Sequence, residues 1–157
     1  GTTDFVAVAA FQGRVADLMR RMTAAGEELD AIGQALRHAR ASVTAAPRAD
    51  AALFARIDSV AAKVAALQRR LNGDPARQRL DESNEISMFG RAYVAMQFGN
   101  RQAPTATQQR EATLAESELV VFERDLRALL DGDVAHLQDA LAKSGAPWST
   151  GRGLRTP

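Results

Sequence analysis

Few residues in this sequence have the chemistry for a metal or redox site, and their spacing does not favour one. The chain of 157 residues holds two histidines and no cysteine, which excludes thiol catalysis and thiolate metal ligands. His136 follows Asp133 by three residues, a spacing at which both side chains could reach one metal ion from a helix. His38 falls on the outer face of a predicted helix. We interpret both histidines as exposed surface residues, so the sequence predicts no metal ion and no haem.

The paired carboxylates and the glycine-rich segments do not indicate a catalytic site either. Glu27–Glu28 and Glu116–Glu118 fall on the surfaces of predicted helices, where solvated charge is the ordinary interpretation. The G-x-G at 151–153 follows no predicted strand and opens no helix, unlike a phosphate-binding loop. The sequence also lacks the G-x-S-x-G turn of a serine hydrolase. We therefore predict no catalytic, cofactor-binding or metal-binding residue, no cofactor, and no enzyme activity for this domain.

A long amphipathic helix organises the chain instead. Its apolar positions alternate in steps of three and four, which is typical of a helix packed along a partner of similar length. The stripe comprises Val8, Phe11, Val15, Leu18, Met22, Ala25, Leu29, Ile32, Leu36, Ala39 and Val43.

Two glycines lie beside this stripe inside the predicted helix. Gly26 and Gly33 each follow a stripe residue, and each costs about 1 kcal/mol relative to alanine in a helix interior. Either a neighbouring helix passes close to them, which we favour, or they form a hinge or a ligand-contact groove. The charged side chains of this helix point away from the stripe and form a solvated face: Arg20, Arg21, Glu27, Glu28, Asp30 and Arg37.

Apolar spacing and capping signals define the remaining elements. The second helix carries a stripe of Leu53, Ile57, Val60, Val64, Leu67 and Leu71, and the third one of Ile86, Phe89, Tyr93 and Met96. Asn72-Gly73 ends the second helix, and Asp74-Pro75 can restart one helical turn. Thr105 and Gln108 have the form of a capping box. The predicted helices are 3–45, 49–72, 84–98, 105–131 and 133–145, followed by a tail at 146–157. Thr2 or Thr3 would cap the first helix, and the third would start near Ser83 or Asn84.

The apolar stripe of the fourth helix shifts by one position near its end. It first follows Ala112, Ala115, Leu119, Phe122, Leu126 and Leu129, and then Leu130, Val134, Leu137 and Leu141. The shift coincides with Asp131-Gly132-Asp133. Either the helix breaks there and Asp133 caps a short fifth helix, or it kinks and continues. We favour the break.

These elements predict an all-α fold, an antiparallel up-and-down four-helix bundle with or without a short fifth helix. Residues 1–157 have the length of a single domain, and the short connection after residue 45 makes the second helix the antiparallel neighbour of the first. The net charge is +1 and the charges are interspersed, so we expect no nucleic-acid partner. No apolar run is long enough for direct membrane insertion. No signal peptide is apparent from Gly1 to Asp4. A start at glycine is what we expect of a processed product or of an excised domain, and we favour the excised domain.

Five short segments in the second half resemble a known family. They are Leu71-Asn72-Gly73-Asp74-Pro75, Gly90-Arg91, the run from Ala103 to Arg110, the run from Leu126 to Asp133, and Gly145-Ala146-Pro147-Trp148-Ser149-Thr150-Gly151-Arg152. In order and spacing they resemble the helical C-terminal domain of bacterial β-propeller proteins labelled glycosyl-hydrolase-like, sortilin-like or BNR (Asp-box) repeat proteins. The last segment is similar to that family's terminal G-A-P-W-[ST]-x-G-R, and the resemblance covers residues 71–152.

This resemblance implies a secreted or cell-envelope parent protein whose propeller carries any chemistry. No catalytic residue of the family maps onto this chain. We therefore expect a non-catalytic accessory domain that packs against or tethers the propeller of the same parent chain, binds another protein, or self-associates. The alternative is the ligand-sensing helical bundle of a receptor. A sensor would contain a pocket between helices lined by polar groups, whereas an accessory domain would have a filled core and an apolar outer patch.

Overall fold

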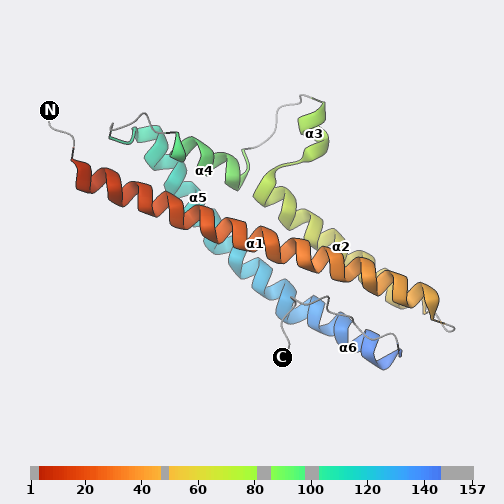
Figure 1. Ribbon diagram of the computed structural model, residues 1–157. Helices are drawn as coiled ribbons and strands as arrows, with labels where there is room; N and C mark the ends of the chain where they lie inside the picture. Colours follow the sequence, from red (N-terminus) through yellow and green to blue (C-terminus); the bar gives the residue numbers. More distant parts are fainter. Residues whose placement is uncertain (1–3, 47–49, 81–85, 98–102, 146–157) are drawn as a thin grey trace. The chain divides into compact units, whose positions relative to one another are not determined.

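The described part of the chain is mainly helical and contains no strand, which confirms the predicted all-α bundle class (Figure 1). The computed structural model describes residues 4–46, 50–80, 86–97 and 103–145. None of the helices in these ranges combines the length and the apolar character needed to cross a membrane. The elements are α1 (Phe5–Ala45), α2 (Ala51–Asn72), α3 (Pro75–Arg79), α4 (Met88–Met96), α5 (Ala106–Ala128), the π-helical η1 (Leu129–Val134) and α6 (Ala135–Lys143).

The chain divides into two compact units. Unit 1 contains Gly1–Ala25 and Arg69–Phe122, and unit 2 contains Gly26–Gln68 and Glu123–Pro157. These units are compact parts of the chain, and the expectation that residues 1–157 form a single domain stays a prediction. The predicted tail and its Trp148 lie outside the described residues.

The stripes predicted for the two long N-terminal helices are confirmed. Every stripe residue from Val8 to Val43 is buried in α1, and so is every stripe residue from Leu53 to Leu71 in α2. Burying one such side chain contributes about 1.5–3 kcal/mol, so these rows supply much of the energy that holds the helices in place. No polar or charged side chain is buried among the described residues.

Several helix ends follow the predicted capping chemistry. The capping box is present, since the Gln108 N–H donates to Thr105 Oγ1 at 3.1 Å and the Thr105 N–H donates to Gln108 Oε1 at 2.9 Å. Gly73 ends α2 with a φ of +88°, a backbone conformation that favours glycine. Asp74 then caps α3, which has Pro75 in its first turn.

The start of α1 differs from the prediction. Thr2 and Thr3, the predicted caps, lie outside the described residues, and Asp4 caps α1. Its carboxylate accepts the N–H groups of Val6 and Ala7, each at 3.1 Å. An aspartate in this position both satisfies free donors and complements the helix dipole.

Helix α4 starts later than predicted and buries a different face. Ser83 and Asn84 lie outside the described residues, and the cap is Ser87, whose Oγ accepts the Gly90 N–H at 3.0 Å. The inner face consists of Met88, Ala92 and Ala95. The stripe predicted as core, comprising Ile86, Phe89, Tyr93 and Met96, is partly or largely exposed. Small side chains let α4 approach α1 and α5 closely, and Ala95 packs with Phe11, Val15 and Ala112 in the core of unit 1.

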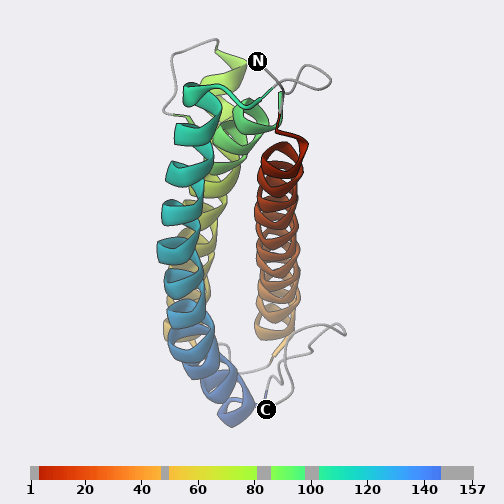
Figure 2. The same cartoon turned by 90° about the vertical axis from the view of Figure 1, so that its left-hand side faces the viewer.

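The favoured break near Asp131 is wrong, because the helix continues through a π turn. The ribbon runs from α5 through η1 into α6 (Figure 2), and no side chain caps α6. Leu129 and Val134 are both buried although they are five residues apart. A π turn closes i→i+5 hydrogen bonds and so accommodates one extra residue per turn. The extra residue explains the shift of the stripe, which resumes at Val134, Leu137 and Leu141, whereas Leu130 is only half-buried.

Candidate functional site

A groove between α1 and α2 in unit 2 is the candidate functional site. Its volume is about 400 Å³, within the range of ligand pockets in proteins. Its lining combines three kinds of residue: the apolar Leu36, Ile57 and Val64, the small Gly33 and Ala61, and the polar or charged Asp30, Gln34, Arg37, Arg40, Asp58 and Gln68.

Two polar bridges between the helices border the groove and show that α1 and α2 are antiparallel. Gln68 Nε2 donates to Asp30 Oδ1 at 3.3 Å, and Arg40 forms an ion pair with Asp58. Position 30 therefore faces 68 and position 40 faces 58, which places the groove along the stretch between them. The Arg40 guanidinium also lies 5.5 Å from the centre of the Phe54 ring.

Gly33 lines the groove without a close neighbouring helix. Among the described atoms, a Cβ added at Gly33 would meet only Arg37 Nη1, at 3.8 Å. The favoured interpretation of Gly33, close approach of another helix, is therefore wrong, and its alternative of a groove agrees with the lining. The same distance shows that the Arg37 guanidinium lies over Gly33, because helical side chains lean toward the N-terminus.

Arg37 and Gln34 are the polar lining residues whose side chains have no hydrogen bond or ion pair within the part of the chain that the structure describes. They are three residues apart and so are neighbours on one face of α1. Their free donors can bind an anion or an acceptor, whereas Asp30, Arg40, Asp58 and Gln68 already have partners.

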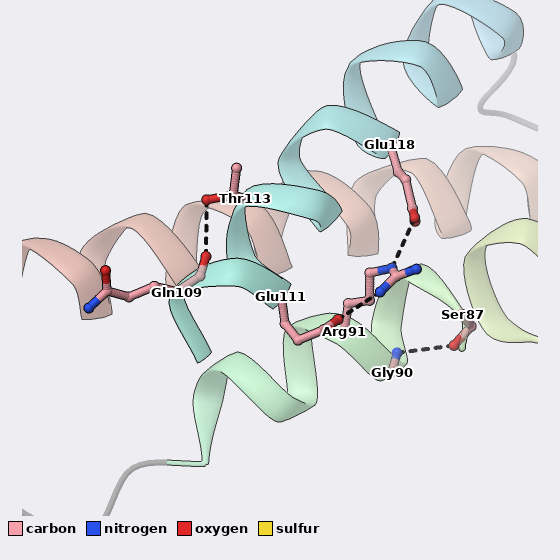
Figure 3. A network of polar contacts seen from close by, with 7 residues as sticks. All are labelled: Ser87, Gly90, Arg91, Gln109, Glu111, Thr113 and Glu118. Atoms are coloured by element: carbon pink, nitrogen blue, oxygen red, sulfur yellow. Dashed lines mark hydrogen bonds and ion pairs between the residues drawn. The ribbon is translucent and has the colours of Figure 1, made fainter. Parts of the chain in front are cut away.

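A second polar cluster lies in unit 1 and joins α4 to α5 (Figure 3). Arg91 Nη1 donates to Glu111 at 2.8 Å and Arg91 Nε donates to Glu118 at 2.9 Å. The Arg91 and Glu111 side chains are only 19% and 13% exposed. The hydrogen bond to Glu111 raises the pKa of Arg91 above its ordinary value, against the opposing effect of burial. An arginine that stays protonated cannot transfer protons, so we assign this cluster to the positioning of α4.

The residues weighed in the sequence as chemical candidates are dispersed. His38 and His136 are both exposed. Asp133 does not act with His136 but binds Lys63, with 2.6 Å between Oδ2 and Nζ. No group of three or more metal-binding side chains occurs within residues 4–46, 50–80, 86–97 and 103–145.

The carboxylate pair at Glu116 and Glu118 is divided between two partners. Glu116 forms an ion pair with Arg14 of α1, and Glu118 forms one with Arg91 of α4. Both pairs connect elements of unit 1. Glu27 and Glu28, the other pair, lie on the outer side of α1 at exposed and half-buried positions.

Sequence reasoning missed most of the groove. Gly33 was singled out, but Asp30 and Arg37 were assigned to a solvated face. The register of α2 against α1 brings Asp58, Ala61 and Gln68 to the same groove, and helix periodicity alone does not set that register.

Comparison of the chain with models of protein families, with curated proteins and with solved structures finds no match. The resemblance to the propeller-associated helical domain therefore stays a prediction. Its described segments coincide with the α2–α3 caps, the Arg91 cluster, the capping box of α5 and the π turn. All of these features begin, end or position helices.

Proposed function

We propose that this chain is a non-catalytic interaction domain that binds another protein through the outer face of α4. We define the outer α4 face as Phe89, Tyr93 and Met96 of the helix together with Ile86, which precedes its cap. One observation carries the proposal: Ile86, Tyr93 and Met96 are 43%, 53% and 44% exposed, although their spacing is that of a buried stripe. Contiguous exposed apolar side chains of this kind mark interaction surfaces, and tyrosine and methionine are enriched at the centres of interfaces.

The inner side of α4 supports the proposal because it holds the outer face in one orientation. Ala95 packs into the core of unit 1, and Arg91 binds two carboxylates of α5. A surface fixed in this way loses little conformational entropy when a partner binds.

The partner that we propose is the β-propeller of the same parent chain, in a secreted or cell-envelope protein. The five segments that resemble the propeller-associated family support this choice. A second copy of this chain is the other partner that the test distinguishes.

The test measures binding to the separately expressed propeller module of the parent reading frame by titration calorimetry. The double variant Tyr93→Ser/Met96→Ser should weaken binding by about two orders of magnitude, as loss of central interface residues does. The matched control is Val120→Ser, which removes an exposed apolar side chain of α5 outside the outer α4 face. It should bind like the wild type.

Sedimentation of this chain alone completes the test. Self-association that the double variant abolishes would support an interaction domain whose partner is a second copy. The proposal fails if the wild type neither binds the propeller nor self-associates, or if the double variant binds as tightly as the wild type.

The groove between α1 and α2 favours a second candidate, the ligand-sensing bundle. Its mixed apolar and polar lining, with the unpaired Arg37 and Gln34, is the convergent arrangement expected of a sensor. A thermal-shift screen of small molecules tests this candidate: binding that substitution of Gly33 by a larger residue abolishes would support it. The absence of any such ligand would contradict it.

A further inference from the structure

We propose that the groove between α1 and α2 binds a small organic carboxylate, with Arg37 as the partner of the carboxylate group. The inference deepens the second candidate function, on which it rests, by naming the class of ligand. It is independent of the outer α4 face, which lies in the other unit.

The contacts within the groove leave the donors of Arg37 available to an acceptor. Arg40 and Asp58 bind each other, and Asp30 accepts a hydrogen bond from Gln68. Arg37 is thus the charged lining residue that has no hydrogen bond or ion pair to any described residue. A guanidinium donates two parallel hydrogen bonds to a carboxylate, the strongest pairing available to it. The Gln34 amide, three residues away, can donate a further bond.

The same charges favour a monoanion over a dianion. Asp30, Asp58, Arg37 and Arg40 carry two charges of each sign, so a carboxylate adds one negative charge to a lining that is neutral overall. A phosphate monoester near neutral pH carries close to two, and its second charge would face Asp30 and Asp58 without a further free cation.

The shape of the groove favours a ligand with a short apolar body. Leu36, Ile57 and Val64 form the floor of the groove, but they are only 4%, 2% and 4% exposed, so they offer little apolar surface and the apolar body must be short. Gly33 and Ala61 leave the space above this floor open, and Gly33 does so at a cost of about 1 kcal/mol in helix stability. No close helix contact requires that glycine. The glycine at position 33 instead leaves room for a ligand next to the unpaired Arg37 guanidinium.

The test uses hexanoate and benzoate as probes, with hexanol as the neutral analogue and hexyl phosphate as the dianion. Binding is followed by calorimetry and by amide chemical shifts of residues 30–40 and 57–68. The wild type should bind the carboxylates saturably and more tightly than the alcohol or the phosphate. Arg37→Gln should weaken carboxylate binding about tenfold, the loss of one strong ionic contact, and Gly33→Leu should abolish it by filling the space.

Matched controls separate the groove from general effects. Arg56→Gln removes an exposed arginine of α2 that does not line the groove, and Gly13→Leu adds a side chain where no described atom lies within 4 Å. Both should bind the carboxylates as the wild type does.

The outcomes distinguish this inference from the function on which it rests. Hexanol binding as tightly as hexanoate, lost in Gly33→Leu but kept in Arg37→Gln, would overturn the carboxylate and leave a ligand-sensing groove. Tighter binding of hexyl phosphate would overturn the monoanion class. Absence of saturable binding by hexanoate and benzoate, or binding unchanged in both groove variants, would overturn the inference, and the wider thermal-shift screen then decides the sensing function.

Discussion

Arg91 of α4 and Glu111 of α5 form a largely buried ion pair with 2.8 Å between Nη1 and Oε2. The same guanidinium binds Glu118, which lies seven residues, or about two helical turns, after Glu111 on α5. One residue therefore fixes both the position and the rotation of α4, which determines the side chains that this short helix presents to solvent.

Arg91→Ala should destabilise unit 1. It leaves Glu111 mostly buried and unpaired, so the free energy of unfolding should fall by about 2 kcal/mol in urea denaturation. Arg91→Lys should recover only part of this loss, because one ammonium cannot reproduce the two-sided contact. Arg14→Ala is the control, since its ion pair with Glu116 is exposed and contributes about 0–1 kcal/mol. Equal losses in the Arg91→Ala and Arg14→Ala variants would contradict the assigned role.

The contribution of Arg91 to the free energy of unfolding should not depend on pH near neutrality. Its pKa is raised from an already high value, so the stabilisation from the guanidinium is complete below the pKa of the unfolded chain and is lost only as the pH rises through the folded pKa. The difference in stability between wild type and Arg91→Ala should therefore stay constant between about pH 6 and pH 9. A difference that declines across this range would show that the guanidinium is not the source of the stabilisation.

Gly33→Ala should stabilise the chain. The new Cβ would make one ordinary contact at 3.8 Å, and alanine in place of glycine contributes about 1 kcal/mol in a helix interior. Gly13→Ala, in open space on the same helix, should give a similar gain. Gly73→Ala should destabilise, because this residue has a φ of +88°. Thermal unfolding followed by circular dichroism measures all three, and a loss of stability in Gly33→Ala would point to a helix packed closely against it.

Deletion of Asp131 should be tolerated. Removing one residue from η1 converts the π turn to an α turn and leaves Leu129 and Val134 on the same face, so the free energy of unfolding should change by about 1 kcal/mol or less. Deleting Ser117 from α5 rotates the following stripe away from the core and should cost several kcal/mol, at about 1.5–3 kcal/mol per displaced side chain. Urea denaturation compares the two, and similar losses would contradict the role given to the π turn.

The long helices could be predicted because their stripes repeat many times. From Val8 to Val43 the steps of three and four leave one face that can be buried, and α2 repeats the pattern from Leu53 to Leu71. The nine-residue α4 offers too few repeats to define its phase. The apolar spacing placed Tyr93 and Met96 on the predicted stripe, whereas the structure buries Ala92 and Ala95.

The π turn and the groove depend on information that local sequence does not contain. Asp131-Gly132-Asp133 has the composition of a turn, yet burial of Val134 and Leu137 on the same face as Leu129 keeps the helix continuous. The groove requires the register that pairs Asp30 with Gln68 and Arg40 with Asp58. Gly33 was the one local signal of it, because a glycine inside a helix is costly.

Hydrogen exchange tests the central claim, that the outer α4 face binds the propeller, most directly. The amides of this chain would be followed alone and in the presence of the separately expressed propeller module. The account predicts that the added protection is centred on α4, Met88–Met96, and is absent from the Tyr93→Ser/Met96→Ser variant. Protection confined to α1 and α2 around the groove, or no added protection at a saturating propeller concentration, would contradict it.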